Sequence, residues 1–338
     1  MTTLSTTTPL LDVRNLQTEF VTDHGVVKAV NDVSFAVSPG ETLGIVGESG
    51  SGKTVTMLTV MQLIAMPPGR IVGGEVLFNG VDLLKMRPSE MRKIRGSKIA
   101  MIFQDPLTSL NPVFTVGEQL IETIRAHLKL SRKAARDHAQ QALSEVGIAD
   151  PSQALSAFPH QFSGGMRQRV MIAMTIACDP ALLIADEPTT ALDVTVQDQI
   201  LRVIDDLRSR LNMAIIWITH DLGIVAGLAD RVLVMYAGEI VEQGITDKLY
   251  ENPRHPYTQG LLQSIPRLDV PRSRRLQPIP GTTASLFHLP PGCQFAPRCA
   301  HRVDQCAEHP PLIDLEAGHG SRCWVNPEPA SLEAADHD

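Results

Sequence analysis

The sequence has no excess of positive charge. Its 30 Lys and Arg residues are outnumbered by 37 Asp and Glu residues, so the net charge at pH 7 is −7. Proteins that bind nucleic acids usually present a basic face to the phosphate backbone. The composition therefore gives no electrostatic support to a nucleic-acid partner, and we expect none.

Long apolar runs are also missing. The longest, Val170 to Cys178, is interrupted by Thr175 and is far shorter than the roughly 20 residues that a membrane-spanning helix needs. The first ten residues are polar and rich in Thr, which is not the pattern of a signal peptide. We therefore expect residues 1–9 to be disordered, and the chain not to cross a membrane itself.

Cysteines are few: there are five in 338 residues. Without an export signal they are not expected to form disulfides, and metal binding or a buried thiol is the more typical use. Cys178 ends an apolar helix and is predicted to be a buried apolar filler. The other four lie in a C-terminal segment rich in Pro, Arg and Gly, which begins near residue 266.

A glycine-rich stretch, Gly47 to Thr54, fits the pattern G-x-x-x-x-G-K-[ST] of a phosphate-binding loop. The end of a buried strand precedes it and a helix follows, so backbone N–H groups and the helix N-terminus would face an anion. Lys53 is expected to reach the β- and γ-phosphates of a nucleotide, and Thr54 to ligate Mg²⁺. The predicted nucleotide-binding residues of this stretch are Gly47, Glu48, Ser49, Gly50, Ser51, Gly52, Lys53, Thr54 and Val55.

Residues 10–14 and 26–37 alternate apolar and polar side chains, which predicts an antiparallel sheet with a turn at 23–25. Such a sheet before a phosphate loop could hold the nucleotide base. Phe20 or His24 is a candidate for stacking on adenine, and an ordinary core position for Phe20 is the alternative.

Polar residues end several predicted strands, where α/β folds place their ligands. The apolar strand 181–187 ends in Asp186 and Glu187. Asp186 is expected to hold Mg²⁺, and Glu187 to accept a proton from an attacking water. Gln104 follows the strand 99–103, and His220 follows the strand 214–219 as a candidate γ-phosphate ligand.

Ser163, Gly164 and Gly165 open an apolar helix. By the same helix-terminus argument this is a second candidate anion site, with a simple N-cap as the alternative. Further helices are predicted at 116–128, 132–146 and 198–211, and a closing hairpin at 231–242.

These motifs, in this order over residues 8–260, resemble the ATP-binding cassette of ABC transporters. The resemblance implies an α/β fold with a RecA-like core, an N-terminal antiparallel β-subdomain and an α-helical subdomain near 105–178. The cassette would span residues 10–260, and a C-terminal extension that carries the cysteines would span 261–338.

The resemblance also implies roles for single residues. Two cassettes would pair head to tail around ATP, so that Ser163, Gly164 and Gly165 contact the γ-phosphate on the partner, and Asp193 contacts the opposite cassette. Glu187 would be the general base, and His220 would hold the γ-phosphate and the water. Gln104 would sense Mg²⁺ and the membrane subunit.

One departure concerns the helix start itself. The commonest signature of the family is LSGGQ, whereas this chain has Phe162 and Met166 at its two ends. The serine and glycines remain, so phosphate contact should survive. The contact that the Gln side chain of LSGGQ makes is lost, because Met166 stands in its place.

Four segments, Gln104–Pro112, Phe162–Arg169, Ala185–Thr195 and His255–Leu262, are similar to the peptide and nickel importer branch, most of all to its oligopeptide permease ATPases. This implies an ATPase that powers oligopeptide uptake at the cytoplasmic face of a bacterial inner membrane. Implied partners are two transmembrane permease subunits, a second homologous ATP-binding subunit and an extracytoplasmic peptide-binding protein. Dipeptide, nickel, haem or glutathione importers are the alternatives. A soluble ABC ATPase outside transport is more distant, because the chain has one phosphate loop and no coiled-coil insertion.

The C-terminal cysteines are Cys293, Cys299, Cys306 and Cys323, with the spacing C-x5-C-x6-C-x16-C. Four thiolates in a segment with little core suit a tetrahedral metal centre or a [4Fe–4S] cluster. No C-x2-C pair typical of a zinc ribbon is present. The peptide-importer resemblance implies the cluster, as a structural staple for the tail; zinc is the alternative, and redox sensing is a further hypothesis.

Overall fold

The computed structural model describes residues 8–104, 109–189, 193–265 and 279–328. Most of the N-terminal segment predicted to be disordered therefore lies outside the described residues. The chain divides into two compact units, each described by itself. The helical unit comprises Met1–Pro9, Val37–Glu41 and Lys85–Trp217, and the phosphate-loop unit comprises Leu10–Ala36, Thr42–Leu84 and Ile218–Asp338.

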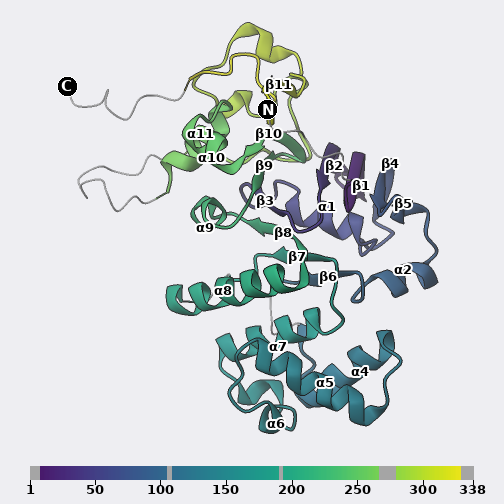
Figure 1. The fold of residues 1–338 in the computed structure, drawn as a ribbon. Coiled ribbons are helices and arrows are strands. Elements are labelled where there is room, and N and C mark those ends of the chain that lie inside the picture. The colour runs from purple at the N-terminus through teal and green to yellow at the C-terminus, as the bar shows by residue number, and fades with distance from the viewer. Residues whose placement is uncertain (1–7, 105–108, 190–192, 266–278, 329–338) are drawn as a thin grey trace. The chain divides into compact units, whose positions relative to one another are not determined.

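An antiparallel sheet forms the N-terminal part of the phosphate-loop unit (Figure 1). Its strands lie in the order β2 (Gly25–Val37), β1 (Leu11–Thr22), β4 (Gly69–Phe78) and β5 (Val81–Asp82). Leu11 pairs with Phe78 and Phe20 with Gly69. The alternation along β1 buries Leu11 and Val13, so the predicted antiparallel sheet is confirmed.

The same unit holds a second run of strands. β3 (Thr42–Val46) is parallel to β9 (Arg231–Tyr236), which continues antiparallel through β10 (Glu239–Ile245) and β12 (His319–Ser321) to β11 (Ile313–Glu316). The β11–β12 hairpin was not predicted, and it places the C-terminal segment directly beside β10. The helices of this unit are α1 (Lys53–Val60), α9 (Leu222–Ala226), α10 (Thr246–Glu251) and α11 (Pro256–Gln263), with 3₁₀ turns η1 (Leu83–Lys85), η3 (Ala296–Arg298) and η4 (Asp304–Ala307).

In the helical unit, β6 (Ile99–Ile102) and β7 (Leu182–Asp186) are parallel, with Ile99 opposite Leu182. β8 (Ala214–Thr219) begins in this unit. All residues of β6 and β7 are buried, as a parallel sheet requires. The helices are α2 (Pro88–Ile94), α4 (Val116–His127), α5 (Arg132–Glu145), α6 (Pro151–Ala154), α7 (Gly164–Ile176) and α8 (Val194–Leu211), with η2 (Pro159–Gln161).

Helices α4 to α7 gather into one group, the helical subdomain that the sequence predicted (Figure 1). Their starts follow from local chemistry: Thr115 and Glu118 form a reciprocal capping box on α4, and Ser131 caps α5. Ala135, Ala139 and other small apolar residues form the buried face of α5. Among the described helices, none is long and apolar enough to cross a bilayer.

Candidate nucleotide site

The phosphate loop adopts backbone conformations that only its glycines adopt without strain. Gly52 lies at φ 102° and forms the N-cap of α1, a conformation that L side chains rarely adopt. Gly47 packs tightly against β9, because a Cβ there would lie 2.3 Å from the Met235 carbonyl oxygen. The predicted strand, loop and helix are therefore all present, and the start of α1 opens on the loop.

Lys53 is the buried cation of this loop, with 5% of its surface exposed. Its Nζ donates to the carbonyl oxygens of Gly47, at 2.7 Å, and Glu48, at 2.9 Å. The ammonium group is thus held beneath the loop by carbonyl oxygens. A positive charge placed beside a helix N-terminus suits the binding of a polyphosphate.

The turn between β9 and β10 supports the loop from behind. The Gly238 N–H donates to the Ser51 carbonyl at 2.9 Å, and the Gly238 carbonyl accepts from the Asn31 N–H at 2.8 Å. The turn between β9 and β10, which is distant in sequence from the phosphate loop, thereby holds the loop in position.

In the helical unit, two of the predicted polar strand ends meet. Asp186 ends β7 and is 4% exposed. Glu187 follows at φ 47°, an uncommon left-handed conformation for a residue other than glycine. The Gln104 side-chain amide donates to Glu187 Oε2 at 3.1 Å, so the structure joins two residues that the sequence assigned to one site.

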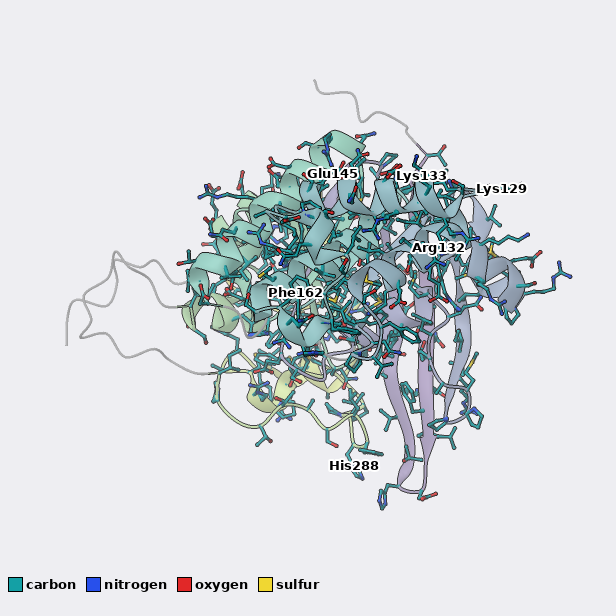
Figure 2. All side chains as sticks on the ribbon, turned by 90° about the horizontal axis from the view of Figure 1, so that it is seen from below. Lys129, Arg132, Lys133, Glu145, Phe162 and His288 are labelled. Atoms are coloured by element: carbon teal, nitrogen blue, oxygen red, sulfur yellow. The ribbon has the colours of Figure 1, made fainter. Side chains whose placement is uncertain are left out.

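The predicted signature residues begin α7. Ser163 caps this helix, and its Oγ accepts from the Met166 N–H at 3.3 Å. Phe162 is buried beside it (Figure 2), whereas Ser163 and Gly164 are exposed. The N-cap alternative is therefore confirmed, and the exposed Ser163 and Gly164 leave the helix start open to an anion.

Asp193 caps the neighbouring helix α8, and its carboxylate accepts from the Val196 N–H at 2.9 Å. The starts of α7 and α8 touch, because a Cβ on Gly165 would lie 2.8 Å from a methyl group of Val196. Residues 190–192, which belong to the importer-like segment Ala185–Thr195, lie outside the described residues.

The remaining predicted nucleotide contacts lie in the phosphate-loop unit. His220 directly follows β8 and is exposed. Phe20 is half-buried on β1, and His24 is exposed in the turn after it. Neither position decides which of the two rings stacks on adenine, and both stay predictions.

The four C-terminal cysteines are largely buried: Cys293, Cys306 and Cys323 are each 8% exposed. The Cys293 N–H donates to the Cys306 carbonyl at 3.0 Å, and Gly292 permits this approach because a Cβ there would lie 2.3 Å from the same oxygen. Burial raises the pKa of Cys293 to about 11. Cys178 is buried, as predicted.

The expected metal centre is not formed as the side chains stand. In the part of the chain that the structure describes, no three His, Cys, Asp or Glu side chains lie close enough together to hold a metal ion. A metal ion that bound these thiols would have to displace their protons.

Sequence reasoning missed two residues that contact the phosphate loop from the C-terminal side. Tyr257 and Arg298 both contact Glu48. The signals were present in the His255-Pro256-Tyr257-Thr258 stretch and in the arginine before Cys299. Neither stretch matches a known nucleotide-binding motif, so no pattern in the sequence indicated that these residues lie beside the phosphate loop.

His255 gives this unit a testable pH dependence. Burial lowers its pKa to about 4, while its ring nitrogen caps α11 by accepting from the Tyr257 N–H at 3.1 Å. Between pH 6.5 and 4 the unfolded chain binds a proton that the folded chain excludes, so stability falls as the pH falls, by about 1.4 kcal/mol per pH unit.

We expect His255→Asn, which keeps a capping side chain, to remove that slope. Urea unfolding at pH 7 and pH 5 should show a wild-type free energy of unfolding that drops by about 2 kcal/mol more than that of the variant. Equal drops in both proteins would contradict the assignment.

Comparisons with known proteins agree with this geometry. Residues 30–190 match the family model described as ABC transporter, and residues 241–306 match the one described as oligopeptide/dipeptide transporter, C-terminal region. A probable peptide ABC transporter ATP-binding protein of Sinorhizobium fredii, y4tR, is 50% identical over 96% of this chain and 97% of its own.

The oligopeptide transport ATP-binding protein OppD of Bacillus subtilis is 49% identical over 96% of this chain and 92% of its own. Among solved structures, the ATP-binding cassette MJ0796, a dimer in a post-hydrolysis state with ADP and Pi, superposes with a TM-score of 0.63 at 25% identity. It covers 70% of this chain and 98% of its own.

Proposed function

The chain belongs to the ABC transporter family, as the ATP-hydrolysing subunit of a peptide importer, and on that premise we propose which residues bind ATP, which hydrolyse it and which contact partner subunits. The expected α/β cassette fold and the expected kinship with oligopeptide permease ATPases are both confirmed. The observation that carries the proposal is the phosphate loop with its buried Lys53.

Nucleotide binding is assigned to the loop residues Gly47 to Val55. Lys53 neutralises the β- and γ-phosphates, and the N–H groups at the start of α1 bind their oxygens. Thr54, Asp186 and Gln104 would hold Mg²⁺, which supplies charge neutralisation on the phosphates when bound. Oxygen donors of this kind are those that Mg²⁺ prefers.

Hydrolysis is assigned to Glu187 as the general base. Its contact with Gln104 at 3.1 Å holds the carboxylate in one orientation, and a fixed acceptor is what deprotonation of a water requires. His220 would hold the γ-phosphate and orient that water. Catalysis is then mostly positioning and charge stabilisation, as in other phosphoryl transfers.

A second, homologous cassette would complete the site. The helix start at Ser163, Gly164 and Gly165 would contact the γ-phosphate bound by the partner, and Asp193 would contact the opposite cassette. The 40% exposure of Met166 and the 83% exposure of Val194 support this pairing, because both flank the two helix starts and such apolar surface favours a protein partner.

The membrane partners would be two permease subunits, with an extracytoplasmic peptide-binding protein in the same complex. The chain would then lie at the cytoplasmic face of a bacterial inner membrane. Residues 104–111 would contribute to a groove for a cytoplasmic coupling helix of the permease. Val113, at 71% exposure, and Phe114, at 49%, follow this segment and support a docking surface there. Residues 105–108 of that segment lie outside the described residues.

Purification from native membranes in mild detergent tests this assembly. We expect the tagged chain to recover two polytopic proteins, a second cassette and a peptide-binding protein, identified by mass spectrometry. Oligopeptides are the proposed cargo, and the identity of the binding protein would distinguish them from dipeptides, nickel, haem or glutathione. Recovery with ribosomal or DNA-repair proteins from the soluble fraction would contradict the transport role.

A [4Fe–4S] cluster held by Cys293, Cys299, Cys306 and Cys323 is proposed as a staple for the C-terminal segment. The donor set is chemically suitable, and backbone N–H groups already point at two of the sulfurs: His301 N lies 3.3 Å from Cys299 Sγ, and Asn326 N lies 3.3 Å from Cys323 Sγ. The four side chains would have to draw together on binding, since they do not form a metal site as they stand.

The cysteine proposal predicts a metal content. Anaerobically purified wild-type chain should hold about four iron atoms and as many sulfides, and Cys323→Ser should lose most of them. Cys178→Ser, a buried cysteine outside this segment, should keep them. One zinc per chain in place of iron would favour the zinc alternative, and absence of both metals would contradict a metal centre.

A further inference from the structure

Glu48, the second residue of the phosphate loop, is engaged through all of its polar groups. Its backbone N–H donates to Tyr257 Oη at 2.8 Å, and its carbonyl oxygen accepts from Lys53 Nζ at 2.9 Å. Its carboxylate accepts from both terminal nitrogens of Arg298, at 2.6 and 3.0 Å. The peptide that holds Lys53 is therefore fixed from the C-terminal part of the chain.

Arg298 is built into this position. It is 8% exposed, and its Nε donates to the Pro280 carbonyl at 2.9 Å. The guanidinium lies over the rings of Tyr236, at 5.9 Å, and Phe295, at 5.8 Å. A planar group that makes a forked contact with a carboxylate and stacks on aromatic rings is a role that Lys cannot fill.

The ionisation of the groups around Glu48 favours the same arrangement. The guanidinium of Arg298 carries its charge at any physiological pH, as arginine side chains do. Burial raises the pKa of Tyr257, so its hydroxyl stays neutral at physiological pH. The carboxylate of Glu48 thus meets the permanent charge of Arg298, and its backbone N–H meets a neutral hydroxyl oxygen.

The segment that carries Arg298 is itself firmly docked. His309 Nε2 lies 2.9 Å from the carboxylate of Glu239, and His319 Nε2 lies 2.8 Å from that of Glu242. Both glutamates lie on β10 and are almost fully buried, at 2% and 0% exposure. Since the turn before β10 also bonds the phosphate loop, the loop and the C-terminal segment share one support.

We propose that Arg298 is a positioning residue for ATP binding: through Glu48 it fixes the carbonyls that hold Lys53, so that the docked C-terminal segment sets the phosphate loop in its binding shape. This inference rests on the proposed role of Lys53 in nucleotide binding. It gives the C-terminal region, which no nucleotide motif covers, a direct influence on the nucleotide site.

The test measures ATP binding and steady-state hydrolysis by the intact transport complex. Arg298→Gln should raise the Kd and the KM for ATP about tenfold, the loss expected for a charge-assisted pair, while kcat at saturating ATP changes less than about twofold. Arg298→Lys should recover part of the loss, since one of the two contacts can re-form. General loosening of the fold would lower kcat as well.

A double-mutant cycle shows whether Arg298 acts through Glu48. Glu48→Gln alone should also raise the Kd about tenfold, and the double variant should bind no worse than either single variant. Arg254→Gln, which breaks contacts with Asn326 inside the C-terminal segment, is the control and should leave the Kd unchanged.

Three outcomes would overturn the inference. The first is an unchanged Kd for ATP in Arg298→Gln, and the second is a Kd about 100-fold above wild type in the double variant, which would mean that the two effects are independent. The third is an equal rise of the Kd in the Arg254→Gln control. If Arg298→Gln does not fold, Glu48→Gln decides alone, because an unchanged Kd there contradicts the positioning role. A wild-type complex that binds no ATP would instead contradict the assigned function.

Discussion

Replacing Glu187 with Gln is expected to lower the rate of ATP hydrolysis by about 10²- to 10⁴-fold, the usual contribution of a positioned general base. Gln has nearly the same shape and still accepts a hydrogen bond from Gln104, which now lies 3.1 Å from Glu187, but it cannot take a proton from water. ATP should still bind within about threefold of the wild-type Kd, because binding rests on the phosphate loop. The measurements are phosphate release and equilibrium nucleotide binding by the purified complex.

The same variant should trap the paired, ATP-bound state, visible as ATP that stays with the complex through size-exclusion chromatography. Glu145→Gln is the matched control: Glu145 lies on the helical unit and pairs with Arg210 at 3.0 Å (Figure 2), and its loss should leave hydrolysis unchanged. Hydrolysis at the wild-type rate by Glu187→Gln would show that another group is the base.

Removing the charge of Lys53 is expected to have the second large effect. Lys53→Ala should weaken ATP binding by about 100-fold or more, since the buried ammonium is proposed to make charge-assisted bonds to two phosphates. The loop itself would also loosen, because Lys53 Nζ bridges the carbonyls of Gly47 and Glu48. Fluorescence titration with a labelled ATP analogue measures the change.

Lys133→Ala removes a lysine from the exposed face of α5 (Figure 2) and should bind the analogue as the wild type does. A wild-type Kd for Lys53→Ala would contradict the assignment of the nucleotide site to this loop, whatever the state of the cysteines or of Arg298.

The loop and strand ends of the proposed nucleotide site could be predicted from sequence because their patterns are local. Gly47 to Thr54 are consecutive residues, and a glycine-rich turn between a buried strand and a helix has few other uses. Asp186 and Glu187 end an apolar strand, so their place at a sheet edge followed from the pattern. The contact between Gln104, after β6, and Glu187, after β7, agrees with the expectation that the ends of neighbouring parallel strands meet at one sheet edge.

The C-terminal segment could not be predicted in the same way. β11 and β12 are short, with four and three residues, and a segment rich in Pro and Gly shows no period that would identify them. Arg298 and Glu48 are 250 positions apart, and no local pattern indicates a partner at that separation. The cysteine spacing suggested a metal, but gathering four thiols depends on the ion as well as on the fold.

Peptide uptake into vesicles tests the central claim most directly. Reconstituted vesicles in which this chain faces the lumen, with the peptide-binding protein outside, would receive a labelled oligopeptide in the outer solution, with and without ATP enclosed in the lumen. We predict ATP-dependent uptake with wild-type chain and uptake reduced to background with Glu187→Gln. Uptake at equal rates with both chains, or none with the wild type while ATP is hydrolysed, would contradict the account.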